Sequence, residues 1–337
     1  MASPSSITEP TRAPAKPFRR IPAADLPNID LRAEIHTHGY ALISNLLPLE
    51  PRQRLLEDTL TTLAAANWLA PGADPLDRIP NPSATCADGD PAHKLLYNRV
   101  FNLPSFHALP HTPALTAMMQ RIVGPELLVF PKSAPRLIFP NFARGVIHAH
   151  QDHTAITGLT DSYTAWMPLH DCSIQHGALR ILEGSHRFGL LPTVANTGFI
   201  GSETFPPGDW VTGPIHAGDV LLFHSLTVHE AAPNLSSQFR LSIDCRFQSY
   251  TEAVNPGVLV FTGAGNRSWE EVYEGWPSTD LQYYWTKLPL TLRPTPFELK
   301  QLAGTADTEA ESARLLRIAE RIEAQRKAHS WPSAEKH

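Results

Sequence analysis

The sequence predicts a mainly β protein, a β sandwich or barrel wrapped by helices, because the pattern of hydrophobic residues changes twice along the chain. Between about residues 127 and 250, short apolar or alternating runs recur with turn residues between them, which is typical of sandwiches and barrels. The flanking segments, residues 40–126 and 251–337, have helical periodicity instead. Hydrophobic residues make up 42% of the 337 residues, enough for a sizeable core. We therefore expect one domain over residues 21–337.

The segment before the core begins with a Ser/Pro/Ala-rich stretch, residues 1–20, which we expect to be a mobile tail. Residues 39–47 predict a first strand, and two helices follow it. Between the helices, the proline-rich residues 70–92 predict a long loop that is a candidate lid over a site. The helices are indicated by apolar stripes, Leu49, Leu56, Leu60 and Leu63 in the first, and Leu115, Met118, Met119 and Ile122 in the second, which Gly124 ends.

Strands dominate the core segment, and helices resume after it. The core strands are expected at residues 127–130, 137–139, 163–169, 178–182, 220–223 and 240–247. Downstream, residues 268–271 have the spacing of a helix capping box, and residues 309–327 carry acids early and bases late, as helices do. Six aromatic residues lie close together in this segment: Trp269, Tyr273, Trp276, Tyr283, Tyr284 and Trp285. We expect this aromatic cluster to pack a helical cap against the barrel, and the alternative is that it forms a dimer interface.

Composition excludes several classes of function. The net charge is −5 and there is no basic stripe, so nucleic acid is not expected as a partner. No apolar run approaches the roughly 18 residues of a membrane span, and the N-terminus does not resemble a signal peptide. The three cysteines are scattered, which favours a reducing, cytoplasmic setting. The 16 histidines, by contrast, invite a search for metal ligands.

One His-x-Asp motif stands out, His150-Gln151-Asp152. On a strand, residues two apart point to the same face, so an imidazole and a carboxylate converge there. His229, at the end of a distant apolar run, can supply a third ligand. Two histidines and one carboxylate form the facial triad of non-haem Fe(II) oxygenases, which leaves coordination positions open. His224 competes for the third place, and the alternative for the motif is an ordinary polar strand end.

A second feature follows His229 in the chain. Residues 240–248 alternate, so that Arg240 and Ser242 share a face with Arg246, while apolar residues occupy the other face. A guanidinium fork and a neighbouring hydroxyl suit the carboxylate of an acidic ligand. The alternative is a solvated strand face. Arg246, about 20 Å along the strand from Arg240, is expected to play no part in binding that ligand.

These motifs, in this order, resemble the phytanoyl-CoA dioxygenase family of Fe(II)/2-oxoglutarate oxygenases. The matching stretches are HAHQDH at 148–153, WMPLHDCSIQHGALRILEGSHRFG at 166–189, HAGDVLLFHSLTVHEAAPN at 216–234 and RLS at 240–242. The resemblance covers roughly residues 127–250 and implies a double-stranded β-helix, the jelly-roll or cupin-like fold, for the core of one catalytic domain.

The resemblance also implies roles for single residues. His150, Asp152 and His229 would bind Fe(II), Arg240 and Ser242 would hold the distal carboxylate of 2-oxoglutarate, and Trp166 would line the co-substrate pocket. Related halogenases lack the carboxylate ligand, so the presence of Asp152 favours hydroxylation, oxidative cyclisation or desaturation, with O2 consumed and succinate and CO2 released.

The substrate is not evident from the sequence. A small molecule is expected, an amino acid or a natural-product intermediate, and the protein is expected to be a monomer or homodimer. Candidate substrate contacts are Arg136, Lys132, His148 and Arg99; the first two are alternatively loop cations, and strand parity places His148 on the ligand face. Two other functions remain open: a cupin-like metalloenzyme that does not use 2-oxoglutarate, and a non-catalytic jelly-roll binding protein.

Overall fold

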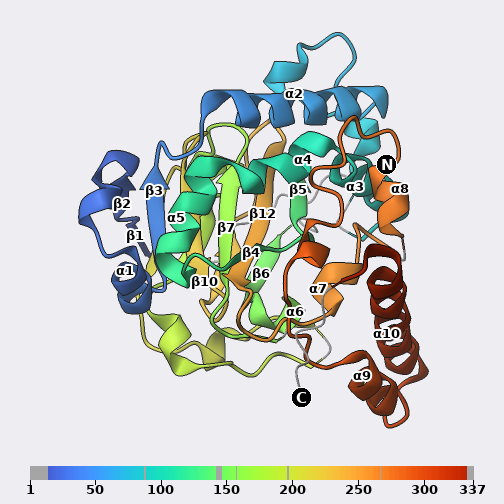
Figure 1. The fold of residues 1–337 in the computed structure, drawn as a ribbon. Coiled ribbons are helices and arrows are strands. Elements are labelled where there is room, and N and C mark those ends of the chain that lie inside the picture. Colours follow the sequence, from blue (N-terminus) through green and yellow to red (C-terminus); the bar gives the residue numbers. More distant parts are fainter. Residues whose placement is uncertain are drawn as a thin grey trace.

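Two mixed β-sheets pack face to face as a sandwich at the centre of the molecule, with helices around them (Figure 1). The structure, a computed structural model, describes residues 14–86, 89–141, 146–156, 158–195, 197–265 and 267–331. The arrangement is the predicted double-stranded β-helix. No helix within these described ranges has the length and apolarity needed to span a membrane.

The first sheet has five strands, and both predicted histidine ligands lie on neighbouring strands of it. In spatial order its strands are β1 (Ala15–Pro17), β9 (Trp210–Thr212), β8 (Leu179–Leu182), β11 (His229–Ala231) and β6 (Ile147–His150).

The second sheet has seven strands and carries the predicted guanidinium clamp. Its order is β2 (Arg20–Pro22), β3 (Tyr40–Ser44), β10 (Val220–His224), β7 (Tyr163–Pro168), β12 (Arg240–Ser249) and β4 (Leu127–Val129), and β5 (Ala134–Ile138) also pairs with β12.

The two faces of the second sheet bury different side chains. On its outer face, the alternate residues of β12, Leu241, Ile243, Cys245 and Phe247, join the large core cluster under the helices. On its inner face Trp166, Leu221 and Phe223 pack with residues of the first sheet. The other residues of β12, from Arg240 to Gln248, are buried polar groups. A polar strand face inside a sandwich marks a site, because buried polar groups need partners.

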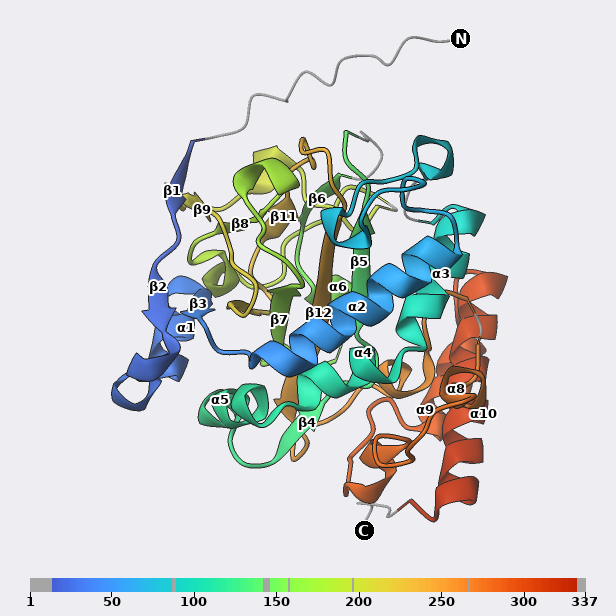
Figure 2. The same cartoon turned by 90° about the horizontal axis from the view of Figure 1, so that it is seen from above.

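Helices cover the outer face and one end of the second sheet. Figures 1 and 2 show α2 across the end of the sandwich, and α5 packs on β4 and β12. The helices are α1 (Leu31–His38), α2 (Leu49–Ala65), α3 (Pro91–Phe101), α4 (Pro104–Ala108), α5 (Pro113–Val123), α6 (His153–Ile156), α7 (Gly257–Val260), α8 (Trp269–Tyr273), α9 (Pro296–Ala303) and α10 (Glu309–His329).

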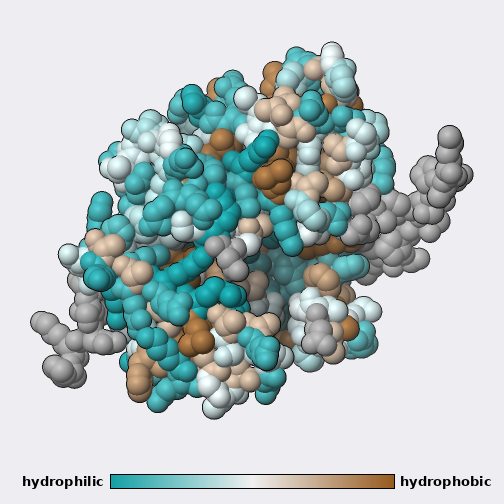
Figure 3. All heavy atoms as spheres, turned by 90° about the vertical axis from the view of Figure 1, so that its right-hand side faces the viewer, coloured by the Kyte–Doolittle hydropathy of each residue, from teal (hydrophilic) through white to brown (hydrophobic). Residues whose placement is uncertain are grey.

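The C-terminal helices form the predicted cap, with α10 packed on α7 and α9. Trp269, Tyr273 and Trp285 of the aromatic cluster are buried in the main core, so packing is confirmed as their role. The outer face of this region is a mosaic of hydrophilic and apolar patches (Figure 3). The capping box at Ser268 is also confirmed.

The structure corrects the predicted tail and the predicted limits of the sheets. Residues 15–17 and 20–22 form strands β1 and β2, whereas residues 1–13 lie outside the described part. Lys16 pairs with Asp209, and Arg20 with Asp219 at 2.8 Å. The sheets therefore include three strands from before residue 127, namely β1, β2 and β3. β1 and β2 are edge strands, so short N-terminal segments complete one edge of each sheet.

Two other predictions differ in detail. Helix α2 buries Leu55, Thr59, Leu60 and Leu63, whereas Leu49, at the first turn, is 60% exposed. In its described part before α3, residues 70–86 and 89–90, the proline-rich loop forms two short 3-10 turns. It packs on the segment that precedes Arg240, where the backbone N–H of Phe239 donates to the carbonyl of Arg78 at 2.9 Å. A candidate lid is thus in contact with the entry to β12.

Candidate functional site

The three predicted metal ligands converge between the sheets. Among the described residues, His150, Asp152 and His229 are the one group of three or more potential ligands whose ligand atoms lie within 4.8 Å of one another. Asp152 Oδ1 lies 3.7 Å from His150 Nε2 and 3.9 Å from His229 Nε2. Metal–nitrogen bonds of about 2.1 Å allow one ion to reach atoms at these separations. The donor set fits Fe(II).

The hydrogen bonds of the two histidines leave Nε2 free for a metal. Nδ1 of His150 lies 2.8 Å from the carbonyl of His148, and Nδ1 of His229 lies 3.0 Å from the carbonyl of Thr227. A carbonyl only accepts, so each Nδ1 carries the proton and each Nε2 has a lone pair. Burial and the neighbouring His229 lower the pKa of His150 to about 3, which keeps it neutral.

His224, the rival third ligand, has the opposite arrangement. Its Nδ1 accepts from the backbone N–H of Leu226 at 3.1 Å, so the proton of the neutral ring is on Nε2. His224 lines a different pocket with Asp161 and His186. It does not belong to the cluster.

Asp152 is buried and strongly held as a carboxylate. Arg246 donates to it twice, from Nε to Oδ2 at 3.3 Å and from Nη2 to Oδ1 at 3.2 Å, and the Thr164 hydroxyl donates to Oδ2. Burial alone would raise the pKa of Asp152, but Arg246 and the two imidazoles hold it well below its usual range. Asp152 is therefore ready to bind a cation at any ordinary pH.

The segment between the ligands is fixed by the side chain of Gln151, which is fully buried. Its amide group donates to the carbonyls of Gly189 and Leu226, and its oxygen accepts from the backbone N–H of Leu191. These bonds fix the backbone between His150, the last residue of β6, and Asp152, which lies just beyond the strand, and the ligand atoms of both residues meet in the cluster.

Arg240 and Ser242 face the same region with polar atoms that have no protein partner. Arg240 is 1% exposed, and one terminal nitrogen donates to the carbonyl of Gly177. Its Nε and the hydroxyl of Ser242 are buried without a hydrogen bond in the structure. Such groups are costly to bury unless a ligand pairs with them. A carboxylate supplies the missing acceptors, so these atoms fit the distal carboxylate of 2-oxoglutarate.

One pocket contains both ligand histidines and Arg240 of the predicted clamp, whereas Ser242 does not line it. Its lining residues are Arg136, Ile147, His150, Trp166, Leu179, Phe223, His229, Arg240 and Asp244. The predicted Trp166 is thus in the wall, with its indole 2% exposed. Arg136 also lines the pocket, where its Nη2 pairs with Asp244 Oδ2 at 2.6 Å.

The other candidate substrate contacts lie outside this pocket. Arg99 is exposed on α3. Lys132 lies over the ring of Phe261, and burial together with the nearby Arg246 and Arg314 lowers its pKa to about 8. His148 is exposed and its ring contacts Phe199.

Strand parity misplaced His148 because the pairing of β6 with β11 is irregular. His229 lies opposite His150, but Ala231 lies opposite Ile147, so β6 has an extra residue there. A bulge of this kind reverses the alternation, and Ile147 takes the inward position that parity gave to His148.

Several residues of the site were not predicted, and two of them, Asp244 and Phe223, line the pocket. Asp244 and Arg246 lie on the predicted polar face of β12. Asp244 pairs with Arg136 of β5, and Arg246 pairs with Asp152. Alternation along one strand does not reveal partners on other strands. Phe223 and Thr164 could have been found from alternation, since Thr164 lies two residues before Trp166 on β7.

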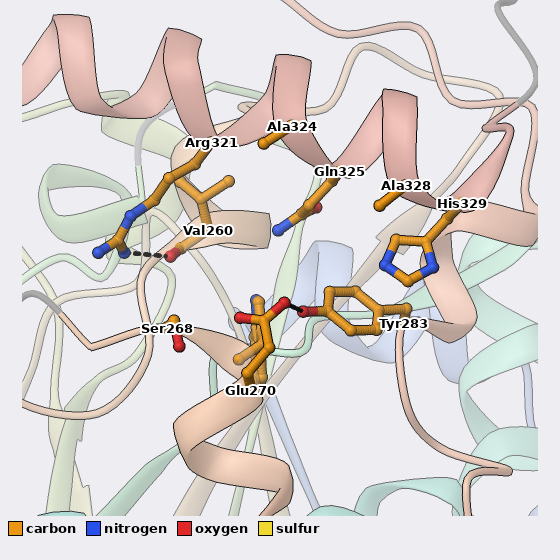
Figure 4. Close-up of a pocket in the computed structure, with 10 residues that line it drawn as sticks. Val260, Ser268, Glu270, Tyr283, Arg321, Ala324, Gln325, Ala328 and His329 are labelled. Carbon is orange, nitrogen blue, oxygen red and sulfur yellow. Dashed lines mark hydrogen bonds between the residues drawn. The ribbon is translucent and has the colours of Figure 1, made fainter.

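A second pocket lies in the helical cap, between α8 and α10 (Figure 4). Its polar groups are largely engaged with one another. The Tyr283 hydroxyl donates to Glu270, and Arg321 donates to the carbonyl of Val260 at 2.9 Å. It contains no cluster of metal ligands among the described residues.

Comparison with known proteins agrees with this geometry. The sequence profile of the family described as "Phytanoyl-CoA dioxygenase (PhyH)" matches residues 35–242. The 1-deoxypentalenic acid 11-beta-hydroxylase of Streptomyces arenae is 29% identical over 232 residues, 63% of this chain and 77% of the relative. The phytanoyl-CoA dioxygenase domain-containing protein 1 of Rattus norvegicus is 29% identical over 150 residues, 41% of this chain and 50% of the relative.

Solved structures share the fold. The epimerase SnoN from nogalamycin biosynthesis, described as non-haem and α-ketoglutarate (2-oxoglutarate) dependent, matches with a TM-score of 0.51 and 24% identity, over 73% of this chain and 94% of that chain. Its complex with Fe3+, α-ketoglutarate and nogalamycin RO matches with a TM-score of 0.53 and 22% identity, over 73% and 93% of the two chains. The profile match spans more than half of the sequence, so the chain belongs to the phytanoyl-CoA dioxygenase family of non-haem Fe(II)/2-oxoglutarate oxygenases.

Proposed function

We propose that this oxygenase hydroxylates a small natural-product intermediate that carries an anionic group. One observation carries the proposal: His150 and His229 of the ligand cluster line one pocket with Arg240, whose Nε is buried without a hydrogen bond. The same pocket has a further cation, Arg136, in its wall.

In this proposal the first sheet supplies the metal ligands and the second sheet supplies the residues that bind 2-oxoglutarate. The imidazoles of His150 and His229 and the Oδ1 of Asp152 hold Fe(II) from the side of the first sheet. Arg240 and Ser242, on β12, pair with the distal carboxylate of 2-oxoglutarate and so orient its other end toward the metal. Trp166 and Phe223 provide apolar walls that exclude water from the reacting centre.

The bound iron and 2-oxoglutarate supply the oxidising chemistry, in which O2 is consumed and 2-oxoglutarate is decarboxylated to succinate. The residues of this chain position the reactants. Neither ligand histidine serves as a general base, because each Nδ1 is engaged with a carbonyl and each Nε2 is directed to the metal.

Arg136 supports an anionic substrate. Its guanidinium is held by Asp244 through Nε at 2.7 Å and Nη2 at 2.6 Å. A guanidinium has five N–H donors, so two bonds to Asp244 leave donors for a ligand carboxylate. The relative from Streptomyces arenae is named for a carboxylic acid substrate, 1-deoxypentalenic acid. We therefore favour a carboxylated intermediate over a neutral one.

A screen for succinate release tests this proposal. The panel contains carboxylated terpenoid and polyketide intermediates, the methyl ester of each acid, free amino acids and acyl-CoA thioesters. We expect an acid to stimulate succinate formation and to gain one oxygen atom, while its methyl ester does not react. Equal turnover of the ester, or turnover of amino acids or thioesters alone, would contradict the proposed substrate class.

A further inference from the structure

Asp152 is held from the opposite sheet by two neighbouring side chains. It follows β6 of the first sheet, whereas Arg246 and Thr164 lie directly opposite one another on β12 and β7 of the second. Arg246 is 6% exposed and Thr164 is 1% exposed. The contact therefore joins the two halves of the sandwich at the candidate metal ligand.

The two carboxylate oxygens of Asp152 have different surroundings. Oδ1 faces both imidazoles, at 3.7 and 3.9 Å from their Nε2 atoms. Oδ2 accepts from the Thr164 hydroxyl and from Arg246 Nε. The Nη2 of Arg246 also reaches Oδ1, so the guanidinium spans the carboxylate edge and prevents its rotation.

Resting on the iron site proposed above, we propose that Arg246 and Thr164 are positioning residues that present Asp152 to the metal through Oδ1 alone. Their bonds to Oδ2 compete with coordination by that oxygen. The predicted 2-oxoglutarate clamp, Arg240, lies on the same strand face as Arg246, so β12 sets both the co-substrate and the ligand carboxylate.

The number of open coordination positions depends on this arrangement. Three single ligands from His150, Asp152 and His229 would leave three positions open on the metal, two for 2-oxoglutarate and one for O2. If Asp152 bound through both oxygens, it would occupy the position needed for O2. Arg246 would thus keep this position open for O2, and it would act through its bonds to Asp152.

Nitric oxide probes the open position without turnover. The full-length protein is loaded with Fe(II) and 2-oxoglutarate under anaerobic conditions, nitric oxide is added, and the nitrosyl complex is quantified by electron paramagnetic resonance. We expect the wild-type protein to form this complex. Arg246→Met should reduce the fraction of protein that forms the nitrosyl complex about tenfold or more. This is the usual size of effect when a residue that hydrogen-bonds to a metal ligand is lost. Arg246→Lys, a point charge, should fall between.

Arg180 offers a matched control. It is a buried arginine, 5% exposed, that pairs with Glu230 at 2.9 Å and belongs to β8. Arg180→Met removes an arginine from a buried ion pair but leaves both partners of Asp152 in place. It should form as much nitrosyl complex as the wild type.

Thr164→Val is a second variant that removes only one neutral hydroxyl, and it decides the question if Arg246→Met does not fold. We expect it to lower the nitrosyl fraction by a smaller factor than Arg246→Met. Unchanged nitrosyl formation in Thr164→Val and in any folded Arg246 variant would overturn the positioning role, as would an equal loss in Arg180→Met. Failure of the wild-type protein to bind Fe(II) or 2-oxoglutarate would instead refute the proposed function.

Discussion

His229 lies directly opposite His150 in the antiparallel pair of β11 and β6, and the centroids of their rings are 4.2 Å apart. Residues nearly 80 positions apart in the chain thus meet through one register of hydrogen bonds. The backbone carbonyl that orients each ring comes from two residues earlier in the chain. The pairing of strands within one sheet therefore brings the two ligand histidines together, and Asp152 joins them from just beyond the end of β6.

The first prediction concerns the third metal ligand. His229→Ala removes one of three ligand atoms and should weaken Fe(II) binding at least about 100-fold, beyond the range for outer partners. His224→Ala should leave Fe(II) affinity unchanged, since the proton on its Nε2 excludes that atom as a ligand. Titration of Fe(II) into both metal-free variants checks this. Loss of iron in His224→Ala alone would contradict the assignment.

The second prediction concerns the co-substrate clamp. Arg240→Ala should weaken 2-oxoglutarate binding by about two to four orders of magnitude, because removing one partner of a buried charge pair costs about 3–5 kcal/mol. Arg240→Lys should fall between, and Ser242→Ala should cost about tenfold. Fe(II) affinity of the same variants is the control and should not change. Calorimetric titration of 2-oxoglutarate would reject the clamp if Ser242→Ala were more harmful than Arg240→Ala.

The third prediction concerns the substrate. Arg136→Gln keeps a donor for Asp244 but loses the positive charge, so KM for an anionic substrate should rise about tenfold or more. KM for 2-oxoglutarate should change much less. Arg99→Gln, an exposed cation on α3, is the control. Steady-state kinetics with unchanged constants in Arg136→Gln would make Arg136 a structural partner of Asp244.

The fourth prediction concerns stability at acid pH. Burial lowers the pKa of His107 to about 4, from an ordinary value near 6.5, while its Nε2 donates to the carbonyl of Phe101 at 2.6 Å. Between these values the unfolded state binds a proton that the folded state does not. The stabilising contribution is therefore complete above about pH 6.5 and falls as the pH drops, by about 1.4 kcal/mol per pH unit.

His107→Gln keeps a donor but does not titrate, so its free energy of unfolding should depend less on pH between about 6.5 and 4. Denaturant unfolding of both metal-free proteins at several pH values measures the difference. Identical pH dependence in the variant and the wild type would show that His107 is not a source of the acid sensitivity.

Local patterns in the sequence predicted much of the site. Alternation placed Arg240 and Ser242 on one face, and the structure buries that face between the sheets. The same pattern could not show that Arg246 binds Asp152, because the two residues are held by opposite sheets. Periodicity shows which face of a strand a side chain occupies, but it does not show which residue of another strand that side chain contacts. The expectation that Arg246 plays no part in binding 2-oxoglutarate stays a prediction, and the structure adds a contact between its guanidinium and the candidate metal ligand Asp152.

Irregular structure accounts for the other differences. The extra residue in β6 turned His148 outward, although its spacing from His150 predicted the ligand face. Residues 15–17 were predicted as part of a tail because their composition is that of a linker, yet β1 gains backbone pairing at the edge of a sheet. Neither bulges nor the recruitment of edge strands is visible in hydrophobic periodicity.

An anaerobic titration of 2-oxoglutarate into the Fe(II)-loaded protein, followed by visible absorption, tests whether the three ligands hold iron that binds the co-substrate. We expect a weak metal-to-ligand charge-transfer band in the wild-type protein and in His224→Ala. The band should be absent in Asp152→Ala, and Arg240→Ala should require far more 2-oxoglutarate to develop it. Absence of the band in the wild-type protein, or an undiminished band in Asp152→Ala, would contradict the central claim that His150, Asp152 and His229 hold the iron to which 2-oxoglutarate binds.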